Sequence, residues 1–144
     1  MIFPSKEWFR AAVKALHADA GVQAAARDFG PVTAGAVIEK GGGLGKDFCL
    51  FASLDPAREP ALQFPDDEDE LEEMEPQYLI RAPYPVLKRM LQAALRGERQ
   101  DDPLGPVLRR EVRLSGDLER LVRYSRGHRG VGQGILRAIP TEPV

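Results

Sequence analysis

The spacing of apolar residues along the chain changes from a helical period to a period of two and back again. After Ser5 the apolar positions recur every three or four residues, which predicts a helix with Ser5 as its N-cap. A second short helix is predicted to follow Asp19 and to stop at Gly30-Pro31. The apolar stripes of these two helices comprise Trp8, Phe9, Ala12, Val13 and Leu16, and then Val22, Ala25, Ala26 and Phe29.

Strict alternation takes over in two runs, residues 32–39 and 48–54, with the glycine-rich segment 41–45 between them. Alternating runs that flank a loop able to adopt positive φ are typical of a β-hairpin. The second run has apolar side chains on both faces, which is typical of a strand in the middle of a sheet. Further short strands are predicted over residues 61–64, 77–82 and 111–115.

Helical spacing returns in residues 84–95, and Asp117 is the expected N-cap of a last helix. Strands that follow one another through short turns pair mainly antiparallel, and helices set apart from them in the sequence cover one face of the sheet. With 144 residues, of which 43% are hydrophobic, the chain has the size and composition of one globular domain. We therefore expect a single α+β domain over residues 1–144.

Two segments do not fit this pattern. Residues 66–75 hold eight acidic side chains in ten positions, and a solvated acidic loop is expected there. A glycine-rich tail is expected from residue 126 onward. The first 80 residues carry seven Lys/Arg and 15 Asp/Glu, and the rest carry 13 and seven, so the two halves of the fold should attract each other. The acidic pI of 5.7 argues against a nucleic-acid partner.

Chemistry for catalysis is scarce in the sequence. Cys49 stands among apolar residues, as an inert buried thiol does. Neither His17 nor His128 has a Cys or His at metal-ligand spacing, and the glycine-rich segments lack the lysine and hydroxyl of a phosphate-binding loop. We therefore expect no enzyme activity, no metal and no cofactor. Without a secretion signal or an apolar run of about 20 residues, the expected location is the cytoplasm.

Three features of residues 77–124 follow one another in a fixed order. A strand leads into a helix with Tyr84 near its start, and a polar-proline step, Asp102-Pro103, precedes a short helix at Val107-Leu108. A strand of alternating basic and aliphatic residues then ends in Gly-Asp-aliphatic, at residues 116–118. In this order the features resemble the sterol carrier protein family, and the missing peroxisomal address suits a bacterial standalone member.

The resemblance implies a five-stranded, mainly antiparallel sheet with helices over one face and an apolar tunnel between them. It implies binding and transfer of a fatty acid, acyl-CoA, sterol-like molecule or phospholipid, with transient membrane contact. The same apolar residues could instead fill a solid core, which leaves open an accessory or protein-interaction domain with no ligand. Arg123 is the candidate for meeting an anionic head group, although a solvated helix face paired with the acidic run is the favoured explanation of the arginines. The candidate ligand-binding residues are Trp8, Phe9, Phe48, Leu50, Phe51, Leu87, Met90, Leu91, Leu118, Val122 and Arg123.

Overall fold

The structure is a computed structural model that describes residues 1–96, 111–127 and 135–144. The short helix predicted at Val107-Leu108, its Asp102-Pro103 step and His128 lie outside the described residues. In chain order the elements are β1 (Ile2–Phe3), α1 (Lys6–Ala18), α2 (Ala20–Phe29), β2 (Val32–Glu39), β3 (Phe48–Leu54), β4 (Ala61–Gln63), α3 (Glu68–Glu73), β5 (Tyr78–Pro83), α4 (Tyr84–Leu95), β6 (Arg113–Ser115), α6 (Leu118–Gly127), the 3₁₀ helix η1 (Ile135–Ala138) and β7 (Glu142–Pro143).

Five strands form one sheet in the order β4-β3-β2-β5-β6, with β2 at its centre. Neighbouring strands run antiparallel except for β2 and β5, which run parallel. The chain passes from β4 through α3 to β5, which lies on the side of β2 away from β3. This crossover lets β5 run in the same direction as β2. The prediction of an α+β fold with a five-stranded, mainly antiparallel sheet is confirmed.

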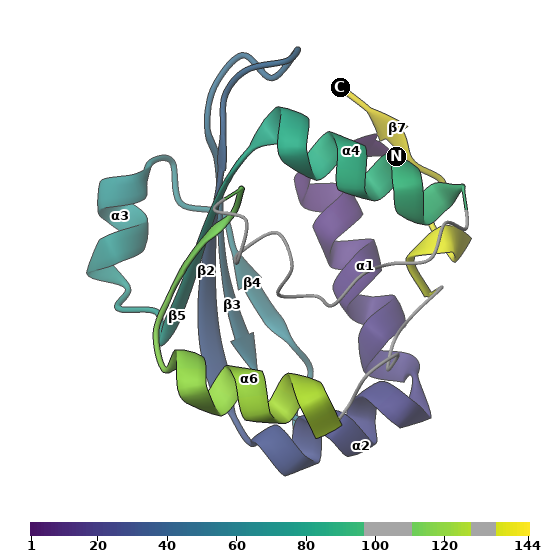
Figure 1. Cartoon of the computed structure of the whole chain (residues 1–144), viewed down its shortest axis with the longest axis vertical. Coiled ribbons are helices and arrows are strands. Elements are labelled where there is room, and N and C mark those ends of the chain that lie inside the picture. Colours follow the sequence, from purple (N-terminus) through teal and green to yellow (C-terminus); the bar gives the residue numbers. More distant parts are fainter. Residues whose placement is uncertain (97–110, 128–134) are drawn as a thin grey trace.

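The longer helices α1, α2, α4 and α6 all lie on one side of the sheet (Figure 1). This arrangement confirms the prediction that helices cover one face. The predicted N-caps Ser5, Asp19 and Asp117 are also present. Each of these side chains accepts a hydrogen bond from a backbone N–H in the first turn of its helix. The caps and donors are Ser5 from Trp8 at 3.1 Å, Asp19 from Val22 at 2.9 Å, and Asp117 from Arg120 at 3.1 Å.

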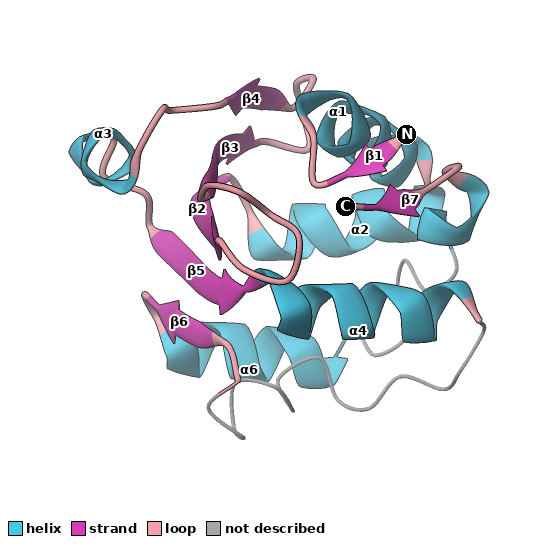
Figure 2. Cartoon of the chain, turned by 90° about the horizontal axis from the view of Figure 1, so that it is seen from above, coloured by secondary structure: helices cyan, strands magenta, loops and turns pink. Residues whose placement is uncertain are grey.

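The acidic run packs against the opposite face of the sheet, so the interpretation of residues 66–75 as a solvated loop is wrong (Figure 2). Within the run, Leu71 is completely buried and belongs to a cluster with Val37 and Phe51. Asp67 caps α3 by accepting from the Glu70 N–H at 2.8 Å, and acidic side chains in a first turn are favoured by the helix dipole. The buried Leu71 and the Asp67 cap therefore hold this charged segment against the sheet as a helix.

The glycine-rich tail ends in an ordered segment rather than a free end. β7 pairs in parallel with β1, so the two ends of the chain lie side by side (Figure 2). The indole Nε1–H of Trp8 donates to the Thr141 hydroxyl at 2.9 Å, and Ile139 is buried in the main core. The last ten residues consequently close one end of the domain. Of the expected tail, residues 128–134 lie outside the described ranges.

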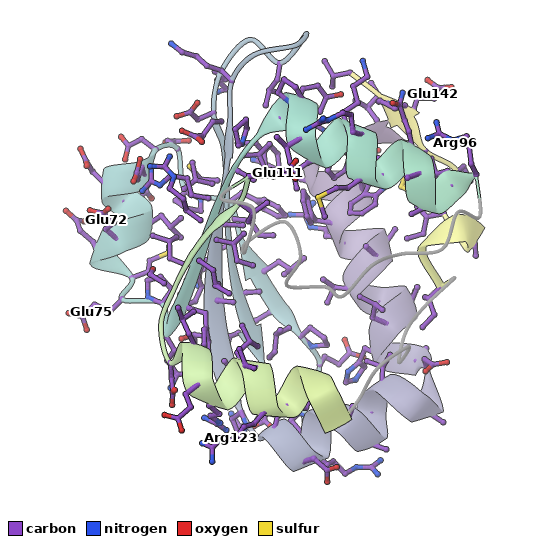
Figure 3. The ribbon with its side chains drawn as sticks, in the orientation of Figure 1. Glu72, Glu75, Arg96, Glu111, Arg123 and Glu142 are labelled. Atoms are coloured by element: carbon purple, nitrogen blue, oxygen red, sulfur yellow. The ribbon has the colours of Figure 1, made fainter. Side chains whose placement is uncertain are left out.

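Replacing Leu71 with alanine tests whether α3 is part of the fold. Removing a fully buried leucine side chain should lower the free energy of unfolding by about 2–5 kcal/mol, as measured by urea denaturation. The matched control is Glu72→Ala on the same helix, because Glu72 points away from the sheet (Figure 3) and should change stability by no more than about 0.5 kcal/mol. Equal stabilities for the two variants would mean that the acidic run does not pack on the sheet.

Candidate functional site

A pocket of about 670 Å³ lies between the helical face of the sheet and helices α1, α2, α4 and α6. This volume is within the roughly 300–1,000 Å³ range of small-molecule sites. Among the described residues, most side chains on its walls are aliphatic or aromatic. The walls comprise Val13, Leu16 and His17 of α1, Val22, Gln23, Ala26 and Phe29 of α2, Val32, Ala34, Leu54, Tyr78, Ile80 and Leu114 of the sheet, Leu87 and Met90 of α4, Leu121 and Tyr124 of α6, and Gly30, Asp55, Pro56, Pro60 and Val112 from connecting segments.

The strand period decides which sheet residues face this pocket. Along β2, Val32 and Ala34 lie on the helical face, whereas Val37 lies in the cluster beneath α3 on the other face. Two small side chains contribute to the apolar wall, with Ala34 on the sheet and Ala26 on α2. Because neither alanine reaches far from its backbone, the helix and the sheet leave space between them there.

The other part of the same face is filled by aromatic side chains. Phe3, Trp8 and Phe9 pack edge to face and tilted, with ring centroids 4.7 Å apart for Phe3 and Trp8 and 5.1 Å apart for Trp8 and Phe9. Phe9 also stacks on Phe48 at 5.5 Å, and Tyr84 is fully buried in the same cluster. The helical face is therefore solid near β1 and β7 and hollow near α2 and α6.

Two of the predicted ligand-binding residues, Leu87 and Met90, line the pocket. Both belong to the apolar stripe of α4, which the helical period of residues 84–95 predicted. Leu91, one position further along α4, instead belongs to the filled cluster.

The aromatic residues chosen from the sequence are not among the residues that line the pocket. Trp8, Phe9 and Phe48 lie in the filled cluster, because they come from the first turn of α1 and the first residue of β3. Phe51 lies on the opposite face beneath α3, because alternation along β3 turns it away from Leu50. Leu50 is buried on the helical side but is not among the wall residues.

The residues predicted on α6 are likewise not among the wall residues. Leu121 and Tyr124 form that part of the wall, whereas Leu118 is 43% exposed and Val122 is half-buried away from it. Arg123 is exposed and extends outward from α6 (Figure 3), so it is not placed to meet a head group inside the pocket. The three-residue spacing from Leu118 to Leu121 and Tyr124 describes one stripe, and only its later part reaches the pocket.

Three side chains hold α6 against the rest of the pocket wall. The Tyr78 hydroxyl donates to the Asp117 carbonyl at 3.0 Å, which ties β5 to the start of α6. Arg120 donates to the Phe29 carbonyl and lies over the Phe29 ring at 4.2 Å from its centroid. Phe29 also meets Tyr124 edge to face at 4.8 Å. Burial, and then the nearby Asp28 carboxylate, raise the pKa of the Tyr124 phenol, so this tyrosine stays neutral in the wall.

Groups that could support other chemistry are few in the described part of the chain. Cys49 is buried, and this burial raises the pKa of its thiol, with Asp47 adding a smaller contribution, so the reactive thiolate is disfavoured. No cluster of three or more His, Cys, Asp or Glu side chains that could hold a metal ion occurs among the described residues. Within the same ranges, no helix is long and apolar enough to cross a bilayer.

No family model matches the sequence, and no curated protein matches it. Two solved structures share its fold over nearly the whole chain. The solution structure of a conserved hypothetical protein from Thermus thermophilus, named as a possible sterol carrier protein, has a TM-score of 0.66 at 16% identity and covers 97% of this chain and 91% of its own. The crystal structure of sterol carrier protein 2 has a TM-score of 0.64 at 16% identity, with 94% and 98% covered. The chain therefore has a sterol-carrier-protein-like fold, as the order of its elements predicted.

Gly116 packs closely against the wall residue Tyr78, and a substitution can test how much stability depends on this close contact. Its φ of +129° is a conformation that favours glycine, and a Cβ there would lie 2.6 Å from the Gln77 carbonyl oxygen and 2.6 Å from the Tyr78 ring. Gly116→Ala should therefore lower the free energy of unfolding by at least about 2 kcal/mol in thermal or urea denaturation. Gly45→Ala is the control, since a Cβ at Gly45 meets nothing within 4 Å. If both alanine variants were equally stable, Gly116 would not be the constraint described here.

Proposed function

We propose that this chain binds an elongated apolar molecule in the pocket beside α2 and α6 and carries it through water. The observation that carries the proposal is the 670 Å³ pocket itself, whose walls among the described residues are mostly hydrocarbon. Each methylene that moves from water into such a pocket contributes about 0.8 kcal/mol, so a long chain can be held without any catalytic group. The shared fold of sterol carrier proteins supports the same function.

The ligand classes expected from the resemblance are a fatty acid, an acyl-CoA, a sterol-like molecule and a phospholipid, each held in the cytoplasm or exchanged at a membrane surface. Leu87 and Met90 are the proposed ligand contacts on α4, and the flexible Met90 side chain can adapt to different shapes. The alternative of an interaction domain with a filled core is less favoured, because the filled cluster occupies only part of the helical face.

The proposal can be tested by filling the pocket from α2. Ala26→Phe places a ring in the pocket, whereas Ala24→Phe puts the same ring outside the pocket wall on the same helix. The affinity for an uncharged polarity-sensitive dye such as Nile red, measured by fluorescence titration, should fall at least about tenfold in Ala26→Phe, equivalent to about 1.4 kcal/mol. Ala24→Phe should bind the dye as the parent chain does.

Native mass spectrometry of the freshly purified chain supplies a second measurement of the same proposal. A bound lipid or apolar metabolite should appear as a mass above that of the chain and should be lost in Ala26→Phe. Absence of both dye binding and bound lipid in the parent chain would refute the carrier function and favour the interaction domain.

A further inference from the structure

Two polar side chains occupy one corner of the otherwise apolar pocket, at the junction of α1 and α2. His17 lies in the last turn of α1, and Gln23 lies in the early part of α2. Both line the pocket and both are half-buried. A pair of polar groups in an apolar pocket is what fixes the orientation of a ligand in most small-molecule sites.

The hydrogen bonds of Gln23 fix which way its amide points. Its Nε2 lies 2.8 Å from the His17 carbonyl oxygen and 2.8 Å from Nδ1 of the His17 ring. A carbonyl oxygen only accepts, so the atom facing it must be the amide nitrogen and not the amide oxygen. Nδ1 of His17 is then also an acceptor, and the neutral ring carries its hydrogen on Nε2.

This assignment leaves one donor and one acceptor unused in the corner. Oε1 of Gln23 is buried without a hydrogen-bond partner, and the Nε2–H of His17 has no acceptor among the residues that the structure describes. The Nε2 atoms of His17 and Gln23, 3.5 Å apart, both carry hydrogens and do not satisfy each other. A hydroxyl group is complementary to such a corner, because it accepts one hydrogen bond and donates another.

The charges around the pocket disfavour an anionic head group. No lysine or arginine is among the described residues that line the pocket. Asp55 does line it, and its carboxylate accepts from the Ala57 N–H at 2.9 Å and lies 4.0 Å from Arg58. Asp55 follows Leu54, which pairs with Val32 just after α2, so this residue lies near the C-terminal end of α2. Burying a carboxylate without a cationic partner is costly, and Gln23 Oε1 would repel it further.

We infer that the pocket selects an apolar molecule with an uncharged hydroxyl head, which accepts from His17 Nε2–H and donates to Gln23 Oε1. The inference rests on the proposed function and narrows it to one class of ligand. Oε1 is covered by surrounding atoms, so the hydroxyl reaches it only when the Gln23 side chain turns toward the pocket. The rest of the molecule lies along the aliphatic wall toward Leu87 and Met90.

Competition against Nile red at pH 8 tests this inference. The competitors are a long-chain alkan-1-ol, its methyl ether and the fatty acid of the same chain length. The alcohol should displace the dye at a concentration at least about tenfold lower than either of the others, because the ether cannot donate and the acid is charged. Equal potency of the alcohol and the acid, or of the alcohol and the ether, would overturn the inference.

Variants of His17 and Gln23 test whether these two side chains cause the preference for the alcohol. Gln23→Met keeps the length of the side chain and should remove the tenfold advantage of the alcohol while Nile red still binds. His17→Phe removes the donor and should reduce the same advantage, which keeps the test open if Gln23→Met does not fold. Gln63→Met, on the exposed edge strand β4, is the control and should leave the advantage unchanged. An advantage that survives both pocket variants would contradict the assignment.

The outcome also separates this inference from the proposed function. If Nile red and all three competitors bind with similar affinities, the pocket is a carrier site without head-group selection, and only the inference fails. If neither the dye nor any competitor binds the parent chain, the carrier function itself fails.

Discussion

The alternation along β2 is the constraint on which the rest of the structure depends. This strand is hydrogen-bonded on both sides, so its register with β3 and β5 is fixed along most of its length. Ala34 stands between Ala52 and Tyr78, and Ile38 stands between Phe48 and Ala82, all on the helical face. A slip of β2 by one residue would turn Ala34 and Ile38 to the other face. The same pairing that builds the sheet therefore decides where its face carries small side chains and where it carries large ones.

That distribution explains why one helical face contains both a solid core and a hollow. Near Ile38 the large rings of Trp8 and Tyr84 fill the space above the sheet, and the chain ends close over them. Near Ala34 the sheet and α2 offer small side chains, and the space stays open. Stability comes from the first region, so the second can leave apolar surface unpacked. A filled cluster and an open pocket therefore lie side by side on one face of the sheet.

Structural features that depend on neighbouring residues could be predicted from the sequence, whereas features that depend on distant residues could not. Helix starts at Ser5, Asp19 and Asp117 could be located because a cap acts within three residues of itself. The role of Leu71 could not, because its burial depends on a sheet face built by other segments. The same holds for β1 and β7, which are too short to show a period and pair across the whole chain. The face of Phe51 follows from alternation alone, which places it opposite Leu50, in the cluster beneath α3.

The candidate site depends on both distant and neighbouring residues. Its pocket depends on distant ones, since Ala26, Ala34 and Leu87 line the same space only in the folded chain. The polar corner is local, because Asp19 is both the C-cap of α1 and the N-cap of α2 and so brings His17 and Gln23 within hydrogen-bond distance across six residues. The proposed binding of an apolar chain and the proposed selection of its head group thus rest on separate parts of the sequence. Substitutions at positions 17 and 23 can change the second without altering the register of β2, on which the first depends.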